Sequence, residues 1–590
     1  MKKLSKLLAV ILAISLLVVP VSAKQETASA SLTYRDISIT IDGERIFPTD
    51  VSGKTVDPFI IDGTTYLPVR AVAEALGCEV AWDDATSTVA INSNAAETVS
   101  HTLKAGAGVG EIKWDASVIT ASNEGFSGEY LDIPHARVLL LEDEVRAAIV
   151  SLELVQPGNI VEDLQALISE ELDVPVDNIW IHCTHSTTTL HIRRDEAAAA
   201  VLAGVKEACV EARATFQPAV MGVGAADLDI NVNRNVPIPA GLDPDQWTGK
   251  NAYGFTGTEY SPKEMTILRF DSAESGEPIG FYMTYPMKPV GLDQSGKANN
   301  ERLITSDIPG YACTMVEDEL GAPCLFFMPA AGDQVSKESA TVPGYLEDGT
   351  WGQTDLGIEA GKAIIEKYGT LMGDAAIALA KGITADENDV DIKVASTTFS
   401  ATGVNRGEQS PVEVPVSAIT IGDDVALVGF KPELDGITGS QLAEASSYDT
   451  TLLVAFMNGD SKYMPHYEAW DYNGGKGTQE VIDGAAYVRG TAETLVEEAV
   501  KLLAEMKDNT PKTGTENVVL NYRDINLVVN GKAFVPTDVN GKVVEPFAID
   551  GTTYLPVRAV AEALGCKAVW DDATGTIAIS SNAAETVSHT

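Results

Sequence analysis

The run Ile61-Asp-Gly-Thr-Thr-Tyr-Leu-Pro-Val-Arg-Ala-Val-Ala-Glu-Ala-Leu-Gly-Cys78 occurs twice in the chain, and its second copy begins at Ile549. The surrounding segment, residues 34–102, returns without a gap as residues 522–590, with about 50 of the 69 positions identical. Self-similarity of this kind indicates one structural unit that is used more than once. The two copies bracket a long central region, and we expect each copy to fold as a small module.

Within each copy, the spacing of apolar residues changes from a strand pattern to a helix pattern. Residues 37–41 alternate between apolar and polar up to Asp42-Gly43, a typical hairpin turn. Residues 69–76 place apolar side chains on one helical stripe, and Gly77 is a common helix stop. A second hairpin pattern spans residues 80–91. Each copy is therefore predicted to be a small α+β module of two hairpins and one helix.

Strand and helix patterns alternate through the central region. Apolar runs at residues 147–154 and 178–181 indicate strands, and the patterns at 160–172 and 195–214 indicate helices. Such alternation is typical of a layered α/β architecture with mixed sheets. The predicted organisation is a signal peptide at 1–30, a first module at 31–102, an α/β domain at 103–506, a polar linker at 507–521 and a second module at 522–590.

The amino terminus has the pattern of a secretory signal peptide. A basic start precedes the apolar run 7–19, and small residues suited to cleavage follow at Val21 and Ala23 or at Ala28 and Ala30. The apolar run is shorter than the ~20 residues that a membrane-spanning helix needs. We therefore expect a secreted or cell-surface protein with no transmembrane segment after signal cleavage.

Charge and cysteine content exclude several classes of protein. The 590 residues include 85 Asp and Glu against 41 Lys and Arg, a formal charge of −44. This balance argues against a nucleic-acid partner, because phosphate recognition needs concentrated positive charge. The six cysteines include no CxxC pair and are too few for a disulfide scaffold. We expect most of them to be buried thiols, although Cys313 and Cys324 could pair.

The repeated run, followed in each copy by Trp-Asp, resembles the copper amine oxidase amino-terminal domain family, a stalk domain of exported bacterial proteins. The resemblance does not imply amine oxidation, because that chemistry belongs to a separate domain with a quinone-forming tyrosine and three copper histidines. The single histidines of the two copies, His101 and His589, follow the last expected strands. We therefore expect no copper and no quinone. Two roles stay open for these modules, binding to a cell-wall or envelope polymer and a simple spacer.

Six short motifs in the central region, taken in chain order, resemble those of the neutral (non-lysosomal) ceramidase family. They lie at residues 178–186 (Asn-Ile-Trp-Ile-His-Cys-Thr-His-Ser), 230–235 (Ile-Asn-Val-Asn-Arg-Asn), 303–312, 326–336, 428–433 and 463–475. Members of this family are zinc amidases that cleave N-acyl sphingosines. The resemblance covers about 300 residues and implies an α/β hydrolase domain with zinc as its cofactor.

The resemblance also implies a set of metal ligands. The family holds its zinc with two histidines, a glutamate and a tyrosine, which leaves room for a water or the substrate carbonyl. Glu433 and Tyr463 stand at the glutamate and tyrosine positions. The first loop allows two alignments. Either Cys183 is the ligand and His185 the second, substrate-facing residue, or a slip of one residue makes His182 the ligand.

Other positions depart from the pattern of the family. At the second liganding histidine this chain has Tyr285, a poor replacement because its phenol must lose a proton near pKa ~10 before it binds well. Arg234 is retained where the family steadies developing charge with a fixed cation. Ser336 stands at the nucleophilic serine, but Gln334 is inserted before it, and a shift of even ~1 Å costs on the order of a hundredfold in rate.

Two functions from different classes follow, and whether the protein is an enzyme stays open. The first is an exported bacterial zinc-dependent hydrolase of an amide or ester bond in a small molecule or lipid. It would use Ser336 or water as the nucleophile, with Arg234 and His185 assisting. The second is a catalytically degenerate cell-surface or cell-wall protein that binds or has a structural role and is displayed through its stalk-like modules. Tyr285 favours the second function.

Overall fold

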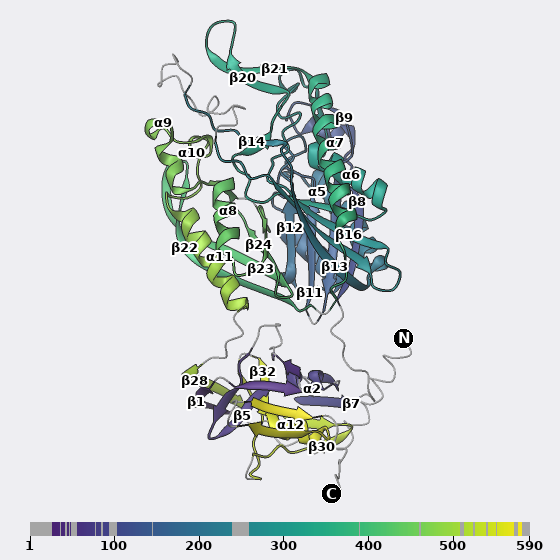
Figure 1. Ribbon diagram of the computed structural model, residues 1–590, viewed down its shortest axis with the longest axis vertical. Helices are drawn as coiled ribbons and strands as arrows, with labels where there is room; N and C mark the ends of the chain where they lie inside the picture. Colours follow the sequence, from purple (N-terminus) through teal and green to yellow (C-terminus); the bar gives the residue numbers. More distant parts are fainter. Residues whose placement is uncertain are drawn as a thin grey trace. The chain divides into compact units, whose positions relative to one another are not determined.

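The computed structural model divides the chain into two compact units (Figure 1). One, the terminal unit, combines Met1–Ser100 with Asp508–Thr590, and the other, the central unit, is His101–Lys507. The structure describes residues 26–35, 37–41, 44–46, 48, 56–76, 78–83, 86–93, 103–143, 145–238, 259–388, 390–459, 462–507, 513–522, 525–538, 541–549, 551–571 and 576–580. Of the predicted signal peptide, residues 1–25 lie outside these ranges, whereas residues 26–30 belong to a strand.

A six-stranded closed barrel in the terminal unit contains strands of both repeat copies. Its order is β1 (Glu26–Arg35), β28 (Thr513–Tyr522), β31 (Phe547–Ile549), β32 (Thr552–Pro556), β5 (Thr64–Pro68) and β4 (Phe59–Ile61). β1 and β28 pair antiparallel over their whole length, from Glu26 opposite Tyr522 to Arg35 opposite Thr513. The predicted linker therefore differs from the structure, because its residues 513–521 form most of β28. Their β-branched side chains and the free edge of β1 favour a strand there.

Two four-stranded sheets complete the terminal unit, and each contains one hairpin from either copy. One has the order β3 (Glu44–Ile46), β2 (Ser38–Ile41), β34 (Thr576–Ser580), β33 (Lys567–Asp571), and the other β30 (Lys532–Phe534), β29 (Asn526–Val529), β7 (Thr88–Ser93), β6 (Cys78–Asp83). The strands at the join are parallel, with Ser38 opposite Thr576 and Asn526 opposite Thr88. The first hairpin of each copy thus completes its sheet with the second hairpin of the other copy.

The helices of the two copies pack together within this exchanged arrangement. They are α2 (Val69–Ala75) and α12 (Val557–Ala563), which contact each other. One apolar core contains side chains from both copies, among them Val72 and Ile91 from the first and Leu527 and Val560 from the second. The hairpins and the helix predicted for each copy are therefore present, but they bury their apolar faces against the other copy.

The central unit contains two large sheets. The first has eight strands in the order β12 (Ile179–Cys183), β11 (Arg146–Leu152), β10 (His135–Glu142), β8 (Lys104–Glu111), β13 (Gln217–Asp227), β15 (Glu264–Ser272), β16 (Pro278–Thr284), β18 (Cys324–Phe327). The second has four, in the order β22 (Ile392–Asn405), β23 (Glu408–Ile421), β24 (Val425–Phe430), β26 (Thr450–Val454). Both sheets are mixed. In the larger, β11 and β12 are parallel and β10 and β11 antiparallel, and in the smaller, β24 and β26 are parallel and β23 and β24 antiparallel. The mixed α/β character predicted for the centre is confirmed.

The two sheets pack face to face, and helices lie outside them (Figure 1). One buried cluster joins side chains of the larger sheet, such as Leu139 and Tyr282, to Ile419 and Leu427 of the smaller sheet. The helices near the larger sheet include α4 (Val161–Leu172), α5 (Asp195–Thr215), α6 (Asp307–Leu320) and α7 (Ile358–Gly382), and those near the smaller sheet α8 (Gly436–Ala445) and α11 (Thr491–Lys507). No helix in the described ranges is long and apolar enough to cross a membrane.

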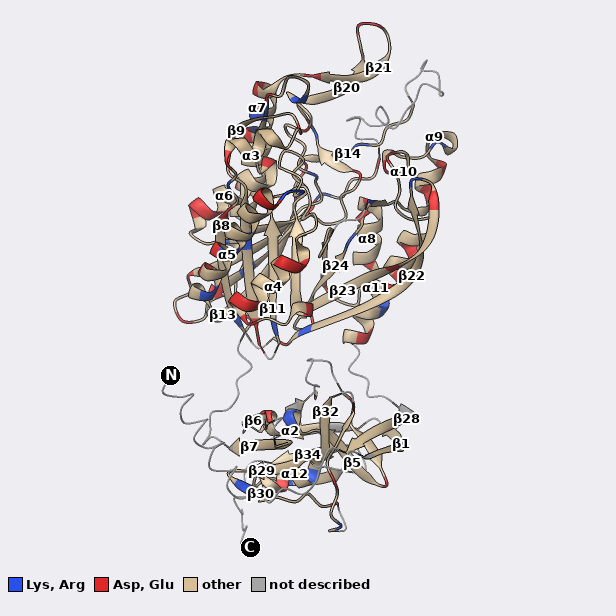
Figure 2. Ribbon diagram, turned by 180° about the vertical axis from the view of Figure 1, so that it is seen from behind, with Lys and Arg blue, Asp and Glu red and all other residues tan. Residues whose placement is uncertain are grey.

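Close contact between α5 and β8 depends on glycines in the strand. A Cβ on Gly108 would lie 2.2 Å from the Ala208 carbonyl oxygen, and one on Gly110 would lie 2.0 Å from that of Gly204. No real Cβ atom tolerates such distances. The absence of side chains at Gly108 and Gly110 therefore allows α5 to pack closely on this face of the sheet. Acidic residues are frequent along helices such as α4 and α11 (Figure 2).

Candidate functional site

Side chains from distant parts of the central unit meet beside a short parallel strand pair. β25 (Glu433–Leu434) and β27 (Tyr463–Met464) place Glu433 directly opposite Tyr463. A second small pair, β14 (Asn231–Asn233) with β19 (Gln334–Ser336), comes directly before Arg234. His185 lies just beyond the end of β12. Arg234, Glu433, Tyr463 and His185, all selected from the sequence, are therefore brought together.

A lysine that the sequence analysis did not select lies at the centre of this group. The Lys288 ammonium donates to Glu433 Oε2 at 2.6 Å and to Tyr463 Oη at 2.9 Å. Lys288 is 3% exposed and Glu433 4%, so this ion pair is shielded from water. The backbone N–H of Lys288 donates to the Gln334 carbonyl at 3.0 Å, which fixes the start of the side chain. We call Lys288, Glu433, Tyr463, Arg234 and His185 the Lys288 site.

The charges of Lys288 and Glu433 stabilise each other. Burial alone would lower the pKa of Lys288, but the nearby Glu433 and Tyr463 outweigh it and raise the pKa above its ordinary value. Burial would likewise raise the pKa of Glu433, yet Lys288, followed by the more distant His185, lowers it. Both groups are therefore charged at neutral pH, and a permanent cation lies between Glu433 and Tyr463.

Arg234 provides a second cation next to the same tyrosine. Its Nε donates to Glu480 Oε1 at 2.8 Å and an Nη donates to Tyr463 Oη at 3.1 Å. The buried Glu480 also accepts from Asn235 at 2.8 Å. Burial would lower the pKa of Arg234, but Tyr463 and Glu480 raise it well above its ordinary value. The Arg234 guanidinium and the Lys288 ammonium lie 5.4 and 4.8 Å from the centre of the Tyr463 ring.

His185 adds a neutral imidazole at the edge of the Lys288 site. Its backbone is left-handed, with φ at 62°, and its ring stacks on Phe456 with centroids 4.7 Å apart. Nδ1 lies 3.0 Å from the Val155 carbonyl, so Nδ1 carries the proton and Nε2 keeps a lone pair. Nε2 is 3.7 Å from Glu433 Oε1. Burial lowers the pKa of His185 to about 4 even though Glu433 opposes the shift, so the ring is neutral at pH 7.

The two alternative ligands of the first loop are used elsewhere. His182 is fully buried, accepts the Met328 N–H at Nε2 (3.0 Å) and donates from Nδ1 to the Ala455 carbonyl (2.6 Å). Both ring nitrogens are therefore engaged, and burial lowers the pKa of His182 to about 3. Cys183, the next residue of β12, faces the other side of the sheet and packs in the apolar cluster under α4 and α5.

Tyr285 and Ser336 also have local structural partners. The Tyr285 hydroxyl donates to the Leu228 carbonyl at 2.5 Å, and burial raises the pKa of this phenol well above its usual value. Ser336 is buried, and its hydroxyl donates to the Glu338 carbonyl at 2.7 Å. The backbone of Lys288 forms an isolated parallel β-bridge with Val335, the residue before Ser336 in β19. Because successive residues of a strand face opposite sides, Ser336 and the Lys288 side chain lie on opposite faces.

A network of carboxyl groups lies behind the Lys288 site. Asp333 accepts from Asn233 Nδ2 at 2.6 Å and from the Gly436 N–H at 2.8 Å. Burial, with the nearby Asp435 and Glu480, raises the pKa of Asp333 to about 7. His466 Nδ1 lies 2.6 Å from Asp435 Oδ2. These groups fix the loops that carry Arg234 and Glu433 in place.

Zinc does not fit the residues that are present. In the part of the chain that the structure describes, no three His, Cys, Asp or Glu side chains are grouped so that they could hold a metal ion. Glu433 and Tyr463, which the resemblance assigns as ligands, point their oxygens at the Lys288 ammonium instead. A metal ion beside that ammonium would meet a like charge at short range, so the cation of the site is part of the protein itself.

Comparison with known proteins agrees with both parts of the architecture. Residues 40–121 and 528–589 match the family model of the copper amine oxidase N-terminal domain. One similar solved structure is described as a ceramidase complexed with C2. The match spans 70% of this chain and 76% of the ceramidase chain, with a TM-score of 0.51 and 15% sequence identity. The match to the structure of neutral ceramidase from Pseudomonas aeruginosa spans 68% of this chain and 74% of that chain, with a TM-score of 0.48 and 16% sequence identity. No curated protein sequence matches the chain.

These likenesses define the fold of the central unit and the type of the two terminal segments. The chain combines a domain of the ceramidase fold with two segments of the copper amine oxidase N-terminal domain type. Identity of 15% establishes the fold alone, so the chemistry must be argued from the Lys288 site. One feature of the sequence points to Lys288. A single cation ends the apolar run Phe281-Tyr-Met-Thr-Tyr-Pro-Met-Lys288, and a buried lysine needs a partner.

Proposed function

We propose that the central unit is a metal-independent binding domain that recognises the amide group of an N-acyl small molecule or lipid. The observation that carries the proposal is the Lys288 ammonium, 2.6 Å from Glu433 and 2.9 Å from Tyr463. Glu433 and Tyr463 stand at two of the four positions at which the ceramidase resemblance puts zinc ligands. A fixed ammonium provides positive charge at this place without a metal, and it cannot generate a metal-activated water.

The donors and acceptors around Lys288 match both ends of an amide. An ammonium has three N–H donors, of which Glu433 and Tyr463 accept two. A carbonyl oxygen is attracted to Lys288 and Arg234, whereas an amide N–H suits the lone pair on Nε2 of His185. His185 is 16% exposed and Arg234 11%, so both side chains reach the accessible edge of the site. The likeness to a ceramidase is what suggests an N-acyl lipid as the ligand.

Hydrolysis of an amide or ester bond is the second candidate function. The ceramidase fold and the unprotonated Nε2 of His185 favour it, because such a nitrogen can accept a proton from water. A pKa of about 4 makes His185 a weak base at neutral pH, however. Ser336 faces away from Lys288, which removes the nucleophile that the family would use. Binding without turnover therefore accounts better for the site.

Metal analysis and activity assays on the purified full-length protein separate the two functions. We expect far less than one zinc per chain and no hydrolysis of N-acyl sphingosine or simple esters, with or without added zinc. We also expect binding of a short-chain N-acyl amide that Lys288→Met abolishes. One tightly bound zinc per chain, together with chelator-sensitive hydrolysis, would overturn the proposal. Hydrolysis without bound zinc would support the second candidate instead.

Export to the cell surface is a further part of the proposal. It rests on the basic and apolar amino terminus and on the two stalk-like segments, which occur in exported proteins of that type. Mass analysis of the mature amino terminus tests it, and we expect the chain to begin directly after one of the two cleavage points, Ala23 or Ala30. An intact amino terminus in cytoplasmic fractions would contradict export.

A further inference from the structure

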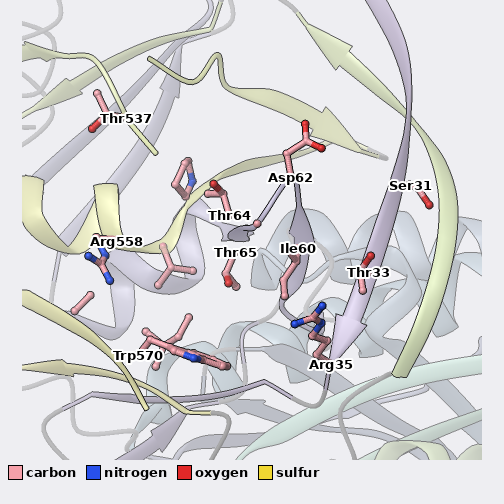
Figure 3. A pocket seen from close by; sticks show the side chains of 15 residues that line it. Ser31, Thr33, Arg35, Ile60, Asp62, Thr64, Thr65, Thr537, Arg558 and Trp570 are labelled. Carbon is pink, nitrogen blue, oxygen red and sulfur yellow. The ribbon is translucent and has the colours of Figure 1, made fainter. Parts of the chain in front are cut away.

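The terminal unit contains a cavity of about 590 Å³ that neither repeat copy forms alone (Figure 3). Residues of the first copy and its leading strand line one side, among them Thr33, Arg35 and Asp62. Residues of the second copy, including Arg558 and Trp570, line the other side. The size lies within the range of pockets that bind small organic ligands. This composite cavity exists only because the two copies exchange strands.

The lining combines positive charge with a flat apolar surface. Among the described residues that line the cavity, Arg35 and Arg558 contribute two guanidinium groups, and Asp62 contributes the one carboxylate. A locally positive cavity in a chain with a formal charge of −44 selects anions. Planar guanidinium groups match carboxylates and phosphates, with which they form paired hydrogen bonds. The charged part of the expected ligand is therefore an acidic group.

The remaining lining indicates the rest of the ligand. Trp570 is 39% exposed, and its indole is part of the cavity lining. Hydroxyl groups of Thr33, Thr64 and Thr537 surround the cavity and can both donate and accept hydrogen bonds. A sugar ring offers one apolar C–H face and an edge of hydroxyl groups. An aromatic face, a ring of hydroxyls and two guanidiniums together suit a sugar that carries an acid.

We propose that the composite cavity binds an anionic saccharide, a sugar bearing a carboxylate or a phosphate. The repeat itself supplies a matched control, because a shift of 488 positions relates Arg558 to Arg70 and Trp570 to Trp82. Arg70 is held by Glu74 at 2.7 Å and by the Val80 carbonyl at 3.1 Å, whereas Arg558 lines the cavity. Trp82 is 40% exposed, so the two tryptophans are equally accessible before any ligand binds.

The strands that precede the two copies, β1 and β28, differ in the side chains that they would contribute to such a cavity. Ser31 and Thr33 line the cavity, and the same shift relates them to Val519 and Asn521. The corresponding place on the other copy thus has valine where the cavity has a hydroxyl. Binding is therefore expected at the cavity built from β1 and the second copy.

Calorimetric titration of the full-length protein tests the proposal with three probes. These are a uronic acid trisaccharide, its neutral methyl ester and a sugar phosphate. We expect binding of the trisaccharide or of the sugar phosphate, and whichever binds identifies carboxylate or phosphate as the acidic group. The methyl ester should bind much more weakly, and added salt should weaken the charged probe. Equal binding of the methyl ester, or no binding of any probe, would overturn the proposal.

Matched variants locate the site. Arg558→Ala and Trp570→Ala should each weaken binding by about tenfold or more, as expected for loss of a charge-assisted hydrogen bond or a buried ring contact. Arg70→Ala and Trp82→Ala should leave affinity unchanged. Equal losses in both pairs would overturn the proposal. If Arg558→Ala lowers the melting temperature, Arg558→Lys keeps the charge and loses the planar fork, and it should still weaken binding.

Discussion

The terminal and central units of this protein bury their cores in different ways. The terminal unit takes strands from two segments that lie more than 400 residues apart and interleaves them in one barrel and two sheets. The central unit is continuous and closes its site with its own ammonium group, which balances Glu433. The terminal unit depends on strands from a distant segment to complete its sheets, and the site of the central unit depends on Lys288 to neutralise Glu433. The terminal unit therefore needs both ends of the chain, whereas the site of the central unit needs the Lys288–Glu433 ion pair to remain neutralised.

Separating the two copies should have the largest effect. We expect a chain consisting of residues 26–100 alone to be unfolded or to form a dimer, because β1, β2 and β7 would each lose the strand that completes their sheet. Size-exclusion chromatography with circular dichroism measures the outcome. A folded monomer of this segment would show that exchange is unnecessary and would remove the contrast between the units.

Breaking the buried ion pair tests the other side of the comparison. Lys288→Met leaves the buried Glu433 carboxylate unpaired and should lower the free energy of unfolding of the central unit by about 3 to 5 kcal/mol. The double variant Lys288→Met with Glu433→Gln should recover most of this loss, because it removes both charges. Urea unfolding measures both changes.

An exposed ion pair gives the control for that experiment. Lys362 on α7 pairs with Glu359 at 2.8 Å, with side chains 37% and 87% exposed. Lys362→Met should change the free energy of unfolding by less than about 1 kcal/mol. An equal loss in the Lys288 and Lys362 variants would contradict the role of burial.

The buried histidines should make the central unit sensitive to acid. Burial lowers the folded-state pKa of His182 to about 3 and that of His185 to about 4, against about 6.5 in the unfolded chain. Between these values the unfolded chain binds more protons, so stability rises with pH and is lost as pH falls from about 6.5 towards 4. Each histidine contributes a slope of up to about 1.4 kcal/mol per pH unit.

Replacing one histidine isolates its share of this slope. His185→Gln should flatten the dependence of the unfolding free energy on pH between about 4 and 6.5, with His182 still contributing. Denaturant unfolding at several pH values provides the measurement. A slope identical to that of the unaltered protein would mean that His185 titrates normally.

Reduction should have the smallest effect. The structure has each of the six cysteines outside any disulfide, five of them buried, and burial raises the pKa of Cys209 to about 12. The option of a Cys313–Cys324 disulfide is thus excluded, and the expectation of buried thiols is confirmed. Dithiothreitol should not change the melting temperature of either unit. Scanning calorimetry checks this, and a lower melting temperature under reduction would indicate a disulfide.

Prediction from the sequence was most successful where the signal was local. The strand at Ile179–Cys183 and the helices at Val161–Leu172 and Asp195–Thr215 lie within one or two residues of their predicted bounds. Each depends on the spacing of apolar residues within one short segment. The segment 513–521 was predicted to be a linker because its polar residues carry no such pattern, and pairing with the distant strand β1 makes it a strand.

The site shows the same division. Motif order was enough to select Arg234, His185, Glu433 and Tyr463, which the structure brings together. It also selected His182, Cys183 and Ser336, whose side chains are turned elsewhere, because a motif does not record the face on which a side chain lies. Lys288 was missed since its partner Glu433 is 145 residues away in the chain.

The sequence by itself determined the repeated modules, the α/β character of the centre, the acidic surface and the likeness to ceramidases. These follow from composition, periodicity and motif order, which are local properties. Only the tertiary structure decided that the two copies exchange hairpins, that their exchange builds a cavity, and that an ammonium group lies where the resemblance puts a metal. Each of these depends on strands or charges that are distant in the chain, and pairing between distant groups is chosen by which edges and charges remain unsatisfied after local structure has formed.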